Sequence, residues 1–182
     1  MPAARIEIKS LGAPCCLVSG EAVSLSGKPL LLLVYLGLNQ TQRIARDRLA
    51  NLLWESPDIA HARHSLSQAL YKIKQLAPEV PLLTDADWVS LKGGCQMDAL
   101  NVLEAAANRD ARVVAVLYRD NFLSTVPHRL PTAFEEWREG VCTRLRRVAI
   151  QSLRVGLEQA YDQNDWAACV QLGSTLAELS PD

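Results

Sequence analysis

The spacing of apolar residues changes several times along the chain, and each spacing predicts one kind of element. Polar and apolar residues alternate over residues 5–9, which is typical of a half-buried β-strand. Turn residues at 12–14 separate this strand from a return strand over 15–18, and Gly20 precedes a short extended segment over 22–25. The chain is therefore expected to open with a small antiparallel sheet.

Three helices are predicted after this sheet. The first, over about residues 30–38, is apolar nearly all round and should be the most buried. The second covers about 46–55, and the third runs from residues 56–58 to about Leu76. Apolar residues of the third helix share one stripe at helical spacing, which leaves its opposite face polar. These residues are Leu66, Ala69, Leu70, Ile73 and Leu76.

Two short runs of β-forming residues, 81–84 and 88–92, surround an acidic turn and predict a hairpin. Gly93-Gly94 follows the hairpin and is the best candidate for a linker. We therefore expect two domains, residues 1–94 and residues 95–182. Everything after the linker is expected to be helical.

Candidate N-cap residues place the helices of the second domain. Asp98 and Asp110 each precede an apolar helical pattern. Thr132 with Glu135 fits a capping box, in which each side chain satisfies one free backbone N–H, in front of a long helix. The boundaries expected around that helix are a loop over 127–131, a break over 162–165 and a last helix over about 166–179.

Composition and charge exclude several classes of protein. Hydrophobic residues make up 49% of the 182 residues and charged residues 21%, which is globular composition with enough apolar surface for a core. Lys plus Arg number 19 and Asp plus Glu 20, so the chain is not a uniformly basic nucleic-acid coat. The longest apolar run, 30–38, is too short to span a membrane. Five scattered cysteines fit no usual disulfide framework, so reduced thiols and a cytoplasmic protein are expected.

The order of the predicted elements is that of a winged helix-turn-helix domain: sheet, three helices, hairpin. The third helix can keep its apolar stripe in the core and present its polar face to a DNA major groove, which is about 12 Å wide. Residues 43–76 carry six Lys or Arg against three Asp or Glu. Such a patch can neutralise a few phosphates, each of which adds roughly −0.9 to the salt slope of duplex binding. The pattern therefore favours DNA binding.

Two segments of this region, 49–54 and 62–74, resemble the winged helix of SARP/AfsR-type bacterial transcriptional activators. That domain is similar to the output domain of OmpR-type response regulators. Residues 82–84 with 89–91 resemble the family's wing. The downstream segments that resemble the start of its bacterial transcriptional activator domain, an all-helical TPR-like module, are 97–100, 117–123 and 134–137.

The resemblance implies a mainly α fold with a small antiparallel β component, built as a winged helix-turn-helix domain followed by an all-α TPR-like domain. It implies sequence-specific binding to double-stranded DNA as head-to-tail homodimers on direct repeats. It also implies activation of transcription and contact with RNA polymerase. Residues 153–182 resemble one TPR helix pair, and because such repeats stack in arrays of about three or more, we expect the natural protein to continue.

The resemblance also assigns residues to the DNA. Glutamine can bridge adenine and Arg or Lys can read guanine, whereas phosphate contacts position the protein without specifying sequence. The residues expected to meet base edges are Arg63, His64, Ser67, Gln68, Tyr71 and Lys72. The residues expected at phosphates are Arg46, Arg48, Lys74 and Lys92.

Three positions depart from the pattern of the family. Ala45 stands where the family has Ser or Thr capping the second helix, and Asp47 can compensate through the helix dipole. Leu157 and Cys169 stand where the TPR repeat prefers Gly and Ala. These larger side chains predict looser packing of that helix pair.

Competing interpretations of the same residues remain open. The runner-up function is a protein-interaction scaffold whose winged helix does not read DNA. His61 and His64 share a helical face, but no Cys or carboxylate cluster supports a metal site. No nucleophile–base set, P-loop or GxGxxG motif is present, so we expect no enzyme, catalytic residue, metal or cofactor.

The aromatic and sulfur-containing side chains have simpler explanations than function. Trp88, Trp137 and Trp166 are expected to lie in or beside the core rather than to stack on bases. The adjacent Cys15 and Cys16 are expected to form part of a buried strand rather than a redox sensor.

Overall fold

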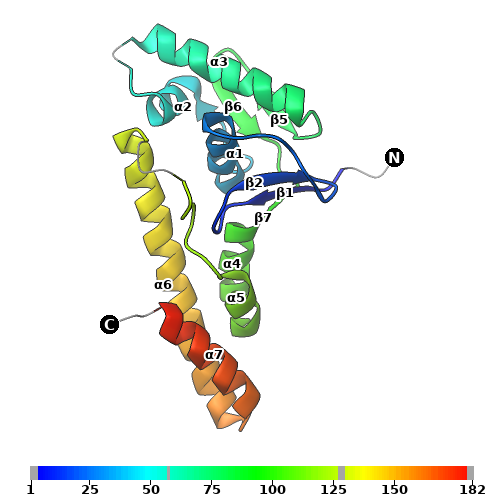
Figure 1. Ribbon diagram of the computed structural model, residues 1–182, viewed down its shortest axis with the longest axis vertical. Coiled ribbons are helices and arrows are strands. Elements are labelled where there is room, and N and C mark those ends of the chain that lie inside the picture. The colour runs from blue at the N-terminus through cyan, green and yellow to red at the C-terminus, as the bar shows by residue number, and fades with distance from the viewer. Residues whose placement is uncertain (1–3, 57, 127–129, 180–182) are drawn as a thin grey trace.

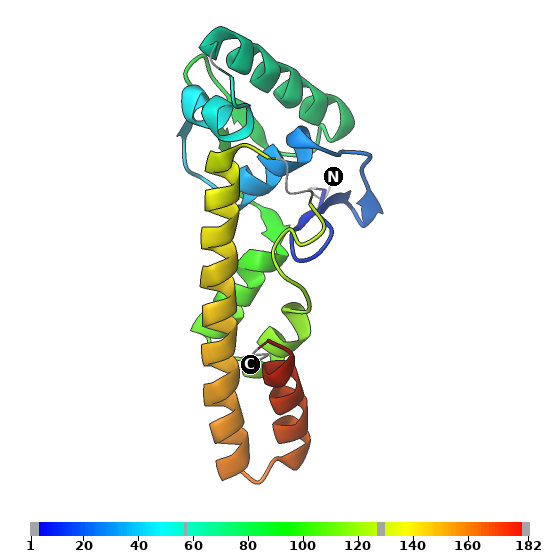
Figure 2. The same cartoon turned by 60° about the vertical axis from the view of Figure 1, so that its left-hand side comes forward.

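The computed structural model describes residues 4–56, 58–126 and 130–179 of the chain. A long helix, α6 (Thr132–Asp162), runs along most of the length of an elongated molecule (Figure 1, Figure 2). At one end lies α3 (Ile59–Leu76), and at the other lies the turn between α6 and α7 (Trp166–Leu179). The fold is mainly α with two small sheets, a winged helix followed by a helical part, as expected.

The first sheet contains a strand that the sequence pattern did not predict. Its order is β3-β2-β1-β7, with β1 (Ile6–Lys9), β2 (Cys15–Val18) and β3 (Glu21–Ala22) forming the expected antiparallel part. Strand β7 (Cys95–Met97) runs parallel to β1, with Ile6 opposite Cys95. The expectation that everything after Gly94 is helical is therefore wrong. Three residues are too few to show a period, and β7 exists because β1 offers it a partner.

The winged helix follows the predicted order. It consists of α1 (Lys28–Leu38), β4 (Ile44–Ala45), α2 (Arg46–Leu53), α3, β5 (Leu82–Thr84) and β6 (Trp88–Leu91). Every residue from 30 to 37 is buried, which explains why α1 is apolar nearly all round. The hairpin pairs β5 with β6, and β4 adds a third strand on the other side of β6.

The helical part contains α4 (Asp98–Ala107), α5 (Ala111–Leu117), α6 and α7. At 1.5 Å per residue the 31-residue α6 is about 46 Å long. It packs against α2 near its N-terminal end and against α4, α5 and α7 farther along. Part of the loop expected over 127–131 lies outside the described residues, as do Pro57 and the last three residues of the TPR-like segment.

An aromatic cluster around Trp137 joins the two parts of the chain. The Trp137 ring on α6 lies 4.8 Å, centroid to centroid, from the ring of Tyr35 on α1. Phe134 and Phe122 contact the same ring at 5.0 and 5.7 Å. These contacts make the hydrophobic core continuous across Gly94. The division into two domains at that residue stays a prediction.

Two of the three expected helix caps are wrong. Asp110 accepts a hydrogen bond from the N–H of Val113 and caps α5 as predicted. Asp98 is the first residue of α4, and its carboxylate is turned toward β1 instead. Pro131, not Thr132, occupies the N-cap position of α6, and Glu135 forms an ion pair with Arg138. The Asp98 carboxylate is taken by a partner distant in the sequence, whereas Glu135 is taken by a residue one turn along its own helix.

The small residues that let α6 approach α5 and α7 lie one position earlier than Leu157 and Cys169. A Cβ atom added at Gly156 would lie 2.2 Å from the Cβ of Ala111 on α5. Ala168 on α7 is buried, while Leu157 and Cys169 are half-buried. The predicted looser packing is therefore wrong, because Gly156 and Ala168 keep the twelve-residue Gly–Ala spacing in a shifted register.

Some side chains expected in the core reach solvent. Leu76 is 38% exposed and Trp166 58%. Trp166 packs edge-on against Tyr161 at the tip of the molecule. Trp88 and Trp137 are half-buried as expected.

Cys16 and Cys95 are the two least exposed cysteines of the first sheet, and both are poor nucleophiles. Burial raises the pKa of Cys16 to about 11 and that of Cys95 to about 11, so both thiols are protonated at neutral pH. Burial also raises the pKa of the half-buried Cys15. The adjacent pair is therefore part of the sheet, and its chemistry is that of inert thiols.

Candidate nucleic-acid interface

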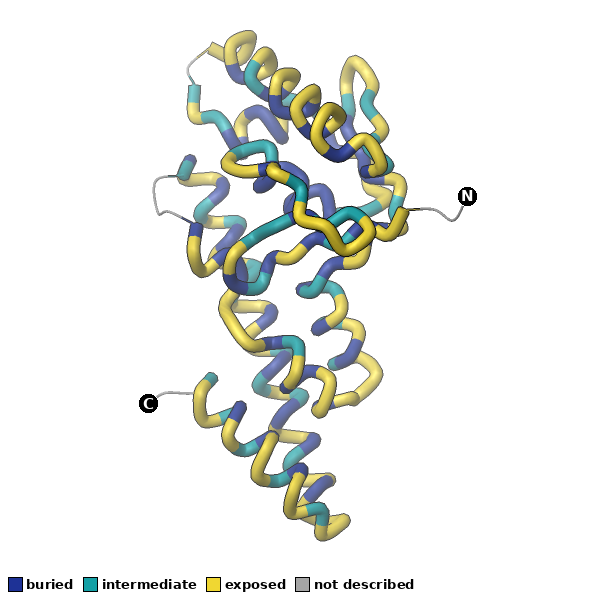
Figure 3. Tube along the Cα trace, turned by 45° about the vertical axis from the view of Figure 1, so that its right-hand side comes forward, coloured by how far each residue is buried: buried dark blue, intermediate teal, exposed yellow. Residues whose placement is uncertain are grey.

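The exposed face of α3 carries all six side chains predicted to meet base edges. Ala62, Leu66, Ala69, Leu70 and Ile73 are buried against the rest of the winged helix, and the opposite face of α3 is exposed to solvent. Figure 3 shows the outer side of α3 exposed along its length and its inner side buried. The residues brought together on this face are Arg63, His64, Ser67, Gln68, Tyr71 and Lys72.

Arg63 is held by an ion pair at the start of this face. Its Nε donates to Oδ1 of the Asp47 carboxylate on α2, and its Nη2 donates to Oδ2 over 2.7 Å. The hydrogen bond from Arg63 holds the pKa of Asp47 below its usual value, and the same bond raises the pKa of Arg63. Asp47 was expected to compensate for the missing cap at Ala45, which indeed makes no side-chain cap. Asp47 lies in the first turn of α2, where the expected dipole interaction places it, and its carboxylate also fixes α2 against α3.

Three of the other candidates are paired with neighbours on α3 itself. Gln68 Nε2 lies 3.0 Å from His64 Nε2, and Gln75 Nε2 donates to the Tyr71 hydroxyl over 3.0 Å. Such pairs orient the side chains along the helix without burying them. Within the part of the chain that the structure describes, Lys72 has no hydrogen-bond or ion-pair partner.

The four predicted phosphate contacts do not form one set. Arg46 Nη2 donates to the Ser67 hydroxyl over 2.7 Å, and Arg46 Nη1 donates to the backbone oxygen of Asp85 over 3.3 Å. Lys74 Nζ donates to the Thr84 hydroxyl over 2.8 Å. Arg46 and Lys74 therefore join α3 to the wing. The remaining two, Arg48 and Lys92, are exposed, and among the described residues they have no such partner.

The wing adds one cation that the predicted contact set left out. The Arg43 guanidinium lies 4.5 Å from the centroid of the Trp88 ring, and both residues belong to the β4–β6 side of the hairpin. A cation held on an aromatic face keeps its charge exposed while its side chain is ordered. Nothing in the local sequence signals this contact, because 45 positions separate the two residues.

The tip of the wing has the opposite charge. Asp85 and Asp87 are both exposed there, on either side of Ala86. Asp87 is close enough to Arg63 to contribute to the raised pKa of that guanidinium. The wing tip would therefore be repelled by a phosphate backbone, and the cations left near α3 for such a contact are those of α3 itself with Arg43, Arg48 and Lys92.

The described residues contain no group of three or more His, Cys, Asp or Glu arranged to hold a metal ion. His61 and His64 are both exposed on α3. In the same part of the chain, no helix combines the length and apolar character needed to cross a membrane.

The comparisons with known proteins bear on the fold. No protein-family profile matches the sequence, and no curated protein has significant sequence similarity to it. Among solved structures, the chain is similar to Mycobacterium tuberculosis EmbR, solved in complex with a low-affinity phosphopeptide. The TM-score is 0.50 at 18% identity, and the match covers 97% of this chain and 54% of the EmbR chain.

EmbR is a transcriptional regulator of the SARP family and not an enzyme. At 18% identity, the match shows a shared fold over nearly all of this chain, including the winged helix and the helical part. This chain spans about half the length of EmbR. The fold is therefore SARP-like, in agreement with the resemblance found in the sequence.

Proposed function

We propose that this chain is a transcriptional regulator that binds double-stranded DNA sequence-specifically through the exposed face of α3. The observation that supports the proposal most is that face itself, because α3 is anchored by a buried stripe and presents polar and cationic side chains outward. Its helix fits a major groove, and the β5–β6 hairpin beside it is placed to flank the duplex. The SARP-like fold supports the same role.

The contacts within the site divide the predicted residues by task. Lys72, Gln68 and Tyr71 are the best candidates for base edges, because none of them ties α3 to another element. Arg63 reaches a base only by exchanging its Asp47 partner for one. Arg48, Lys92 and Arg43 are the candidates for phosphates. Arg46 and Lys74 act mainly by holding α3 and the wing together.

The wider features of the proposal rest on the family resemblance. They are homodimers on direct repeats, activation rather than repression, contact with RNA polymerase through the helical part, and residence in the cytoplasm. The helical part is proposed to be TPR-like. No metal, cofactor or catalytic residue enters the proposal.

One observation favours the scaffold function instead. The acidic tip formed by Asp85 and Asp87 lies beside the helix that would face a polyanion. A basic protein partner would match this tip better than DNA would. The two functions make different predictions for salt dependence and for a charge reversal on α3.

Reversing the charge of Lys72 is expected to weaken specific duplex binding by about tenfold or more, since one good contact is worth about 1–3 kcal/mol. The slope of log K against log salt should also fall by about 0.9. The experiment selects duplexes from a random-sequence library on the purified chain. Binding of the enriched duplex to wild type and Lys72→Glu is then measured by fluorescence anisotropy at several salt concentrations.

Lys9→Glu is the matched control, because Lys9 is an exposed lysine at the end of β1, in the other sheet. It makes the same change in net charge and is expected to leave the affinity within about twofold of wild type. Equal losses in both variants would mean that only net charge matters and would contradict reading by α3. A folded chain that enriches no duplex would overturn the DNA proposal and favour the scaffold.

Replacing Asp47 by asparagine is expected to act in the opposite direction. The substitution removes a negative charge beside α3 and releases Arg63 from its ion pair, so duplex affinity should rise by about threefold. The double variant Asp47→Asn with Arg63→Gln should lose this gain. Anisotropy with the same duplex tests both, and a gain that persists without Arg63 would assign the effect to net charge alone.

A further inference from the structure

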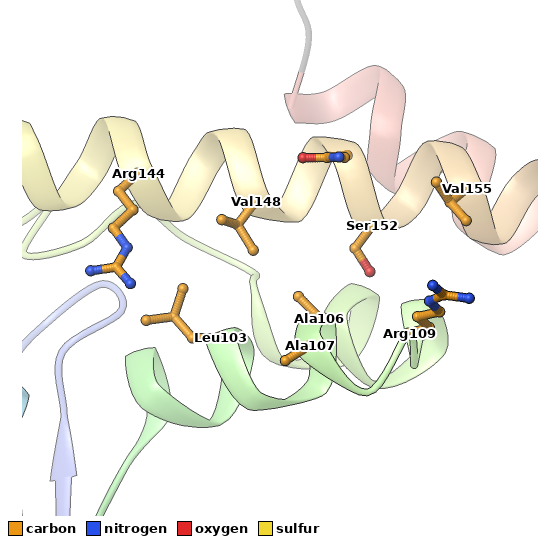
Figure 4. A pocket seen from close by; sticks show the side chains of 9 residues that line it. Leu103, Ala106, Ala107, Arg109, Arg144, Val148, Ser152 and Val155 are labelled. Atoms are coloured by element: carbon orange, nitrogen blue, oxygen red, sulfur yellow. The ribbon is translucent and has the colours of Figure 1, made fainter.

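A cavity of about 680 Å³ lies between α4 and α6, on the helical part and away from α3. Figure 4 shows that its side chains converge from both helices, with Val148 and Ser152 facing Leu103 and Ala106. Cavities of roughly 300–1,000 Å³ lined by apolar groups and a few polar ones are typical of small-molecule sites. The remaining lining residues are Ala107, Arg109, Arg144, Gln151 and Val155.

The cavity carries positive charge without a counter-charge. Its lining contains two arginines, Arg109 at the end of α4 and Arg144 on α6, and no acidic side chain. The two lie toward opposite ends of the row of side chains in Figure 4. Within the residues that the structure describes, neither guanidinium has an ion-pair partner. The lining therefore favours an anion.

Arg109 occupies a backbone position that normally belongs to glycine. The N–H of Asp110 donates to Ala105 O and that of Arg109 to Ala106 O, which is the Schellman arrangement at the end of a helix. Its left-handed residue is Arg109, with φ 59°. An arginine is costly there, because its Cβ crowds the backbone and glycine avoids that contact.

The turn that ends α6 has the same geometry, and its left-handed position holds a residue that is common there. After α6, the N–H of Asp165 donates to Ala160 O and that of Asn164 to Tyr161 O, so Asn164 is the left-handed residue, with φ 58°. Asparagine tolerates this conformation and is a common choice. The same kind of turn thus ends both helices. Of the two, the turn beside the cavity has a long cationic side chain at its left-handed position. Such an outlier points to a role for the side chain.

The floor of the cavity holds an unused hydrogen-bonding group. The Oγ atom of Ser152 is buried and has no hydrogen-bond partner among the described residues. In Figure 4 the Ser152 side chain points from α6 toward α4, on the Arg109 side of Val148. A buried hydroxyl without a partner is unfavourable, and because Ser152 lines the cavity, a rotation of its side chain would bring the hydroxyl to a ligand oxygen.

We propose that this cavity binds a small organic acid with an extended apolar body. Its carboxylate accepts hydrogen bonds from Arg109 and from the Ser152 hydroxyl. Its apolar body lies on Ala106, Leu103 and Val148, and Arg144 favours a second polar or acidic group at the far end. The inference does not depend on DNA binding, because no lining residue belongs to the winged helix.

The test is a ¹⁵N–¹H NMR titration of the 182-residue chain with decanoate, and separately with decanol. Decanoate should produce saturable shifts centred on the amides of Ala106, Arg109 and Ser152. Decanol has the same apolar body without the charge, and we expect its affinity to be lower than that of decanoate by about tenfold or more. Equal binding of the two, or shifts that do not saturate, would overturn the proposal.

Variants separate the role of the arginine from that of the backbone. Arg109→Gln and Arg109→Gly should both weaken decanoate binding by about tenfold. Arg109→Gly should do so with an unchanged or higher unfolding temperature, because glycine suits the left-handed position. A loss of binding is then not a loss of folding.

The matched control is Arg154→Gln, on the same helix as Arg144 but outside the lining. It should bind decanoate within about twofold of wild type. Arg144→Gln should leave decanoate bound and weaken decanedioate, whose second carboxylate reaches the far end. Decanoate binding that survives both Arg109 variants, or falls equally in Arg154→Gln, would contradict the site.

Discussion

Gly156→Ala is expected to destabilise the chain by about 2–3 kcal/mol, although alanine is the better helix former. The new Cβ would lie 2.2 Å from the Cβ of Ala111 and 3.4 Å from a methyl group of Leu172. The Ala111 Cβ is attached directly to the backbone of α5 and cannot rotate away. Relief therefore requires α5 to move from α6, which loosens the packing of α5, α6 and α7. Urea unfolding followed by circular dichroism measures the change.

Gly140→Ala is the matched control on the same helix. Nothing lies within 4 Å of a Cβ atom at Gly140, so this variant should be more stable than wild type by about 0.5–1 kcal/mol. The same substitution is thus expected to change the free energy of unfolding in opposite directions at two sites. Adding Ala111→Gly to Gly156→Ala should recover most of the loss. A Gly156→Ala variant as stable as Gly140→Ala would show that the helices are not in close contact.

Asp98→Ala is expected to cost about 3–5 kcal/mol, the largest effect of a single side chain outside the apolar core. The Asp98 carboxylate accepts the N–H of Ser10 at 2.8 and 2.9 Å, the Ser10 hydroxyl at 2.5 Å and the N–H of Leu11 at 2.9 Å. Ser10 is fully buried. Removing the carboxylate leaves these donors without their acceptor, and two of them belong to the buried Ser10.

The same bonds couple the first sheet to the helical part. Leu123 N–H donates to Ser10 O over 2.8 Å and Gly12 N–H to Asn121 O over 2.9 Å, so the turn after β1 is held from two sides. Asp98→Ala should therefore also increase amide hydrogen exchange at Ser10 and Leu11.

Asp110→Ala is the control for Asp98→Ala. It removes one exposed helix cap and should cost about 1 kcal/mol. Equal costs for the two variants in urea unfolding would mean that Asp98 serves only as the first residue of α4. Asp98→Asn, which keeps one acceptor and loses the charge, should fall between them.

The candidate site illustrates what local pattern can and cannot predict. The exposed face of α3 follows from the apolar stripe alone, because a buried stripe on a helix defines the opposite face by geometry. The partners of the side chains on that face do not follow. Arg63 is paired with Asp47, Arg46 with Ser67 and Lys74 with Thr84. Each pair joins two different elements, and the sequence pattern does not show which elements lie close enough to pair.

By itself, the sequence determined the order of the helices and of the β5–β6 hairpin, the buried α1, the outward face of α3 and the length of α6. Each depends on residues within a few turns of one another, where periodicity, turn residues and breaks act directly. Only the tertiary structure decided that β7 pairs with β1 and that Asp98 accepts hydrogen bonds from the turn after β1. It also decided that Gly156 lies against Ala111 and that Arg109 lines a cavity. These features depend on groups brought together from distant positions, and burial or hydrogen bonding there outweighs the local preference of each residue.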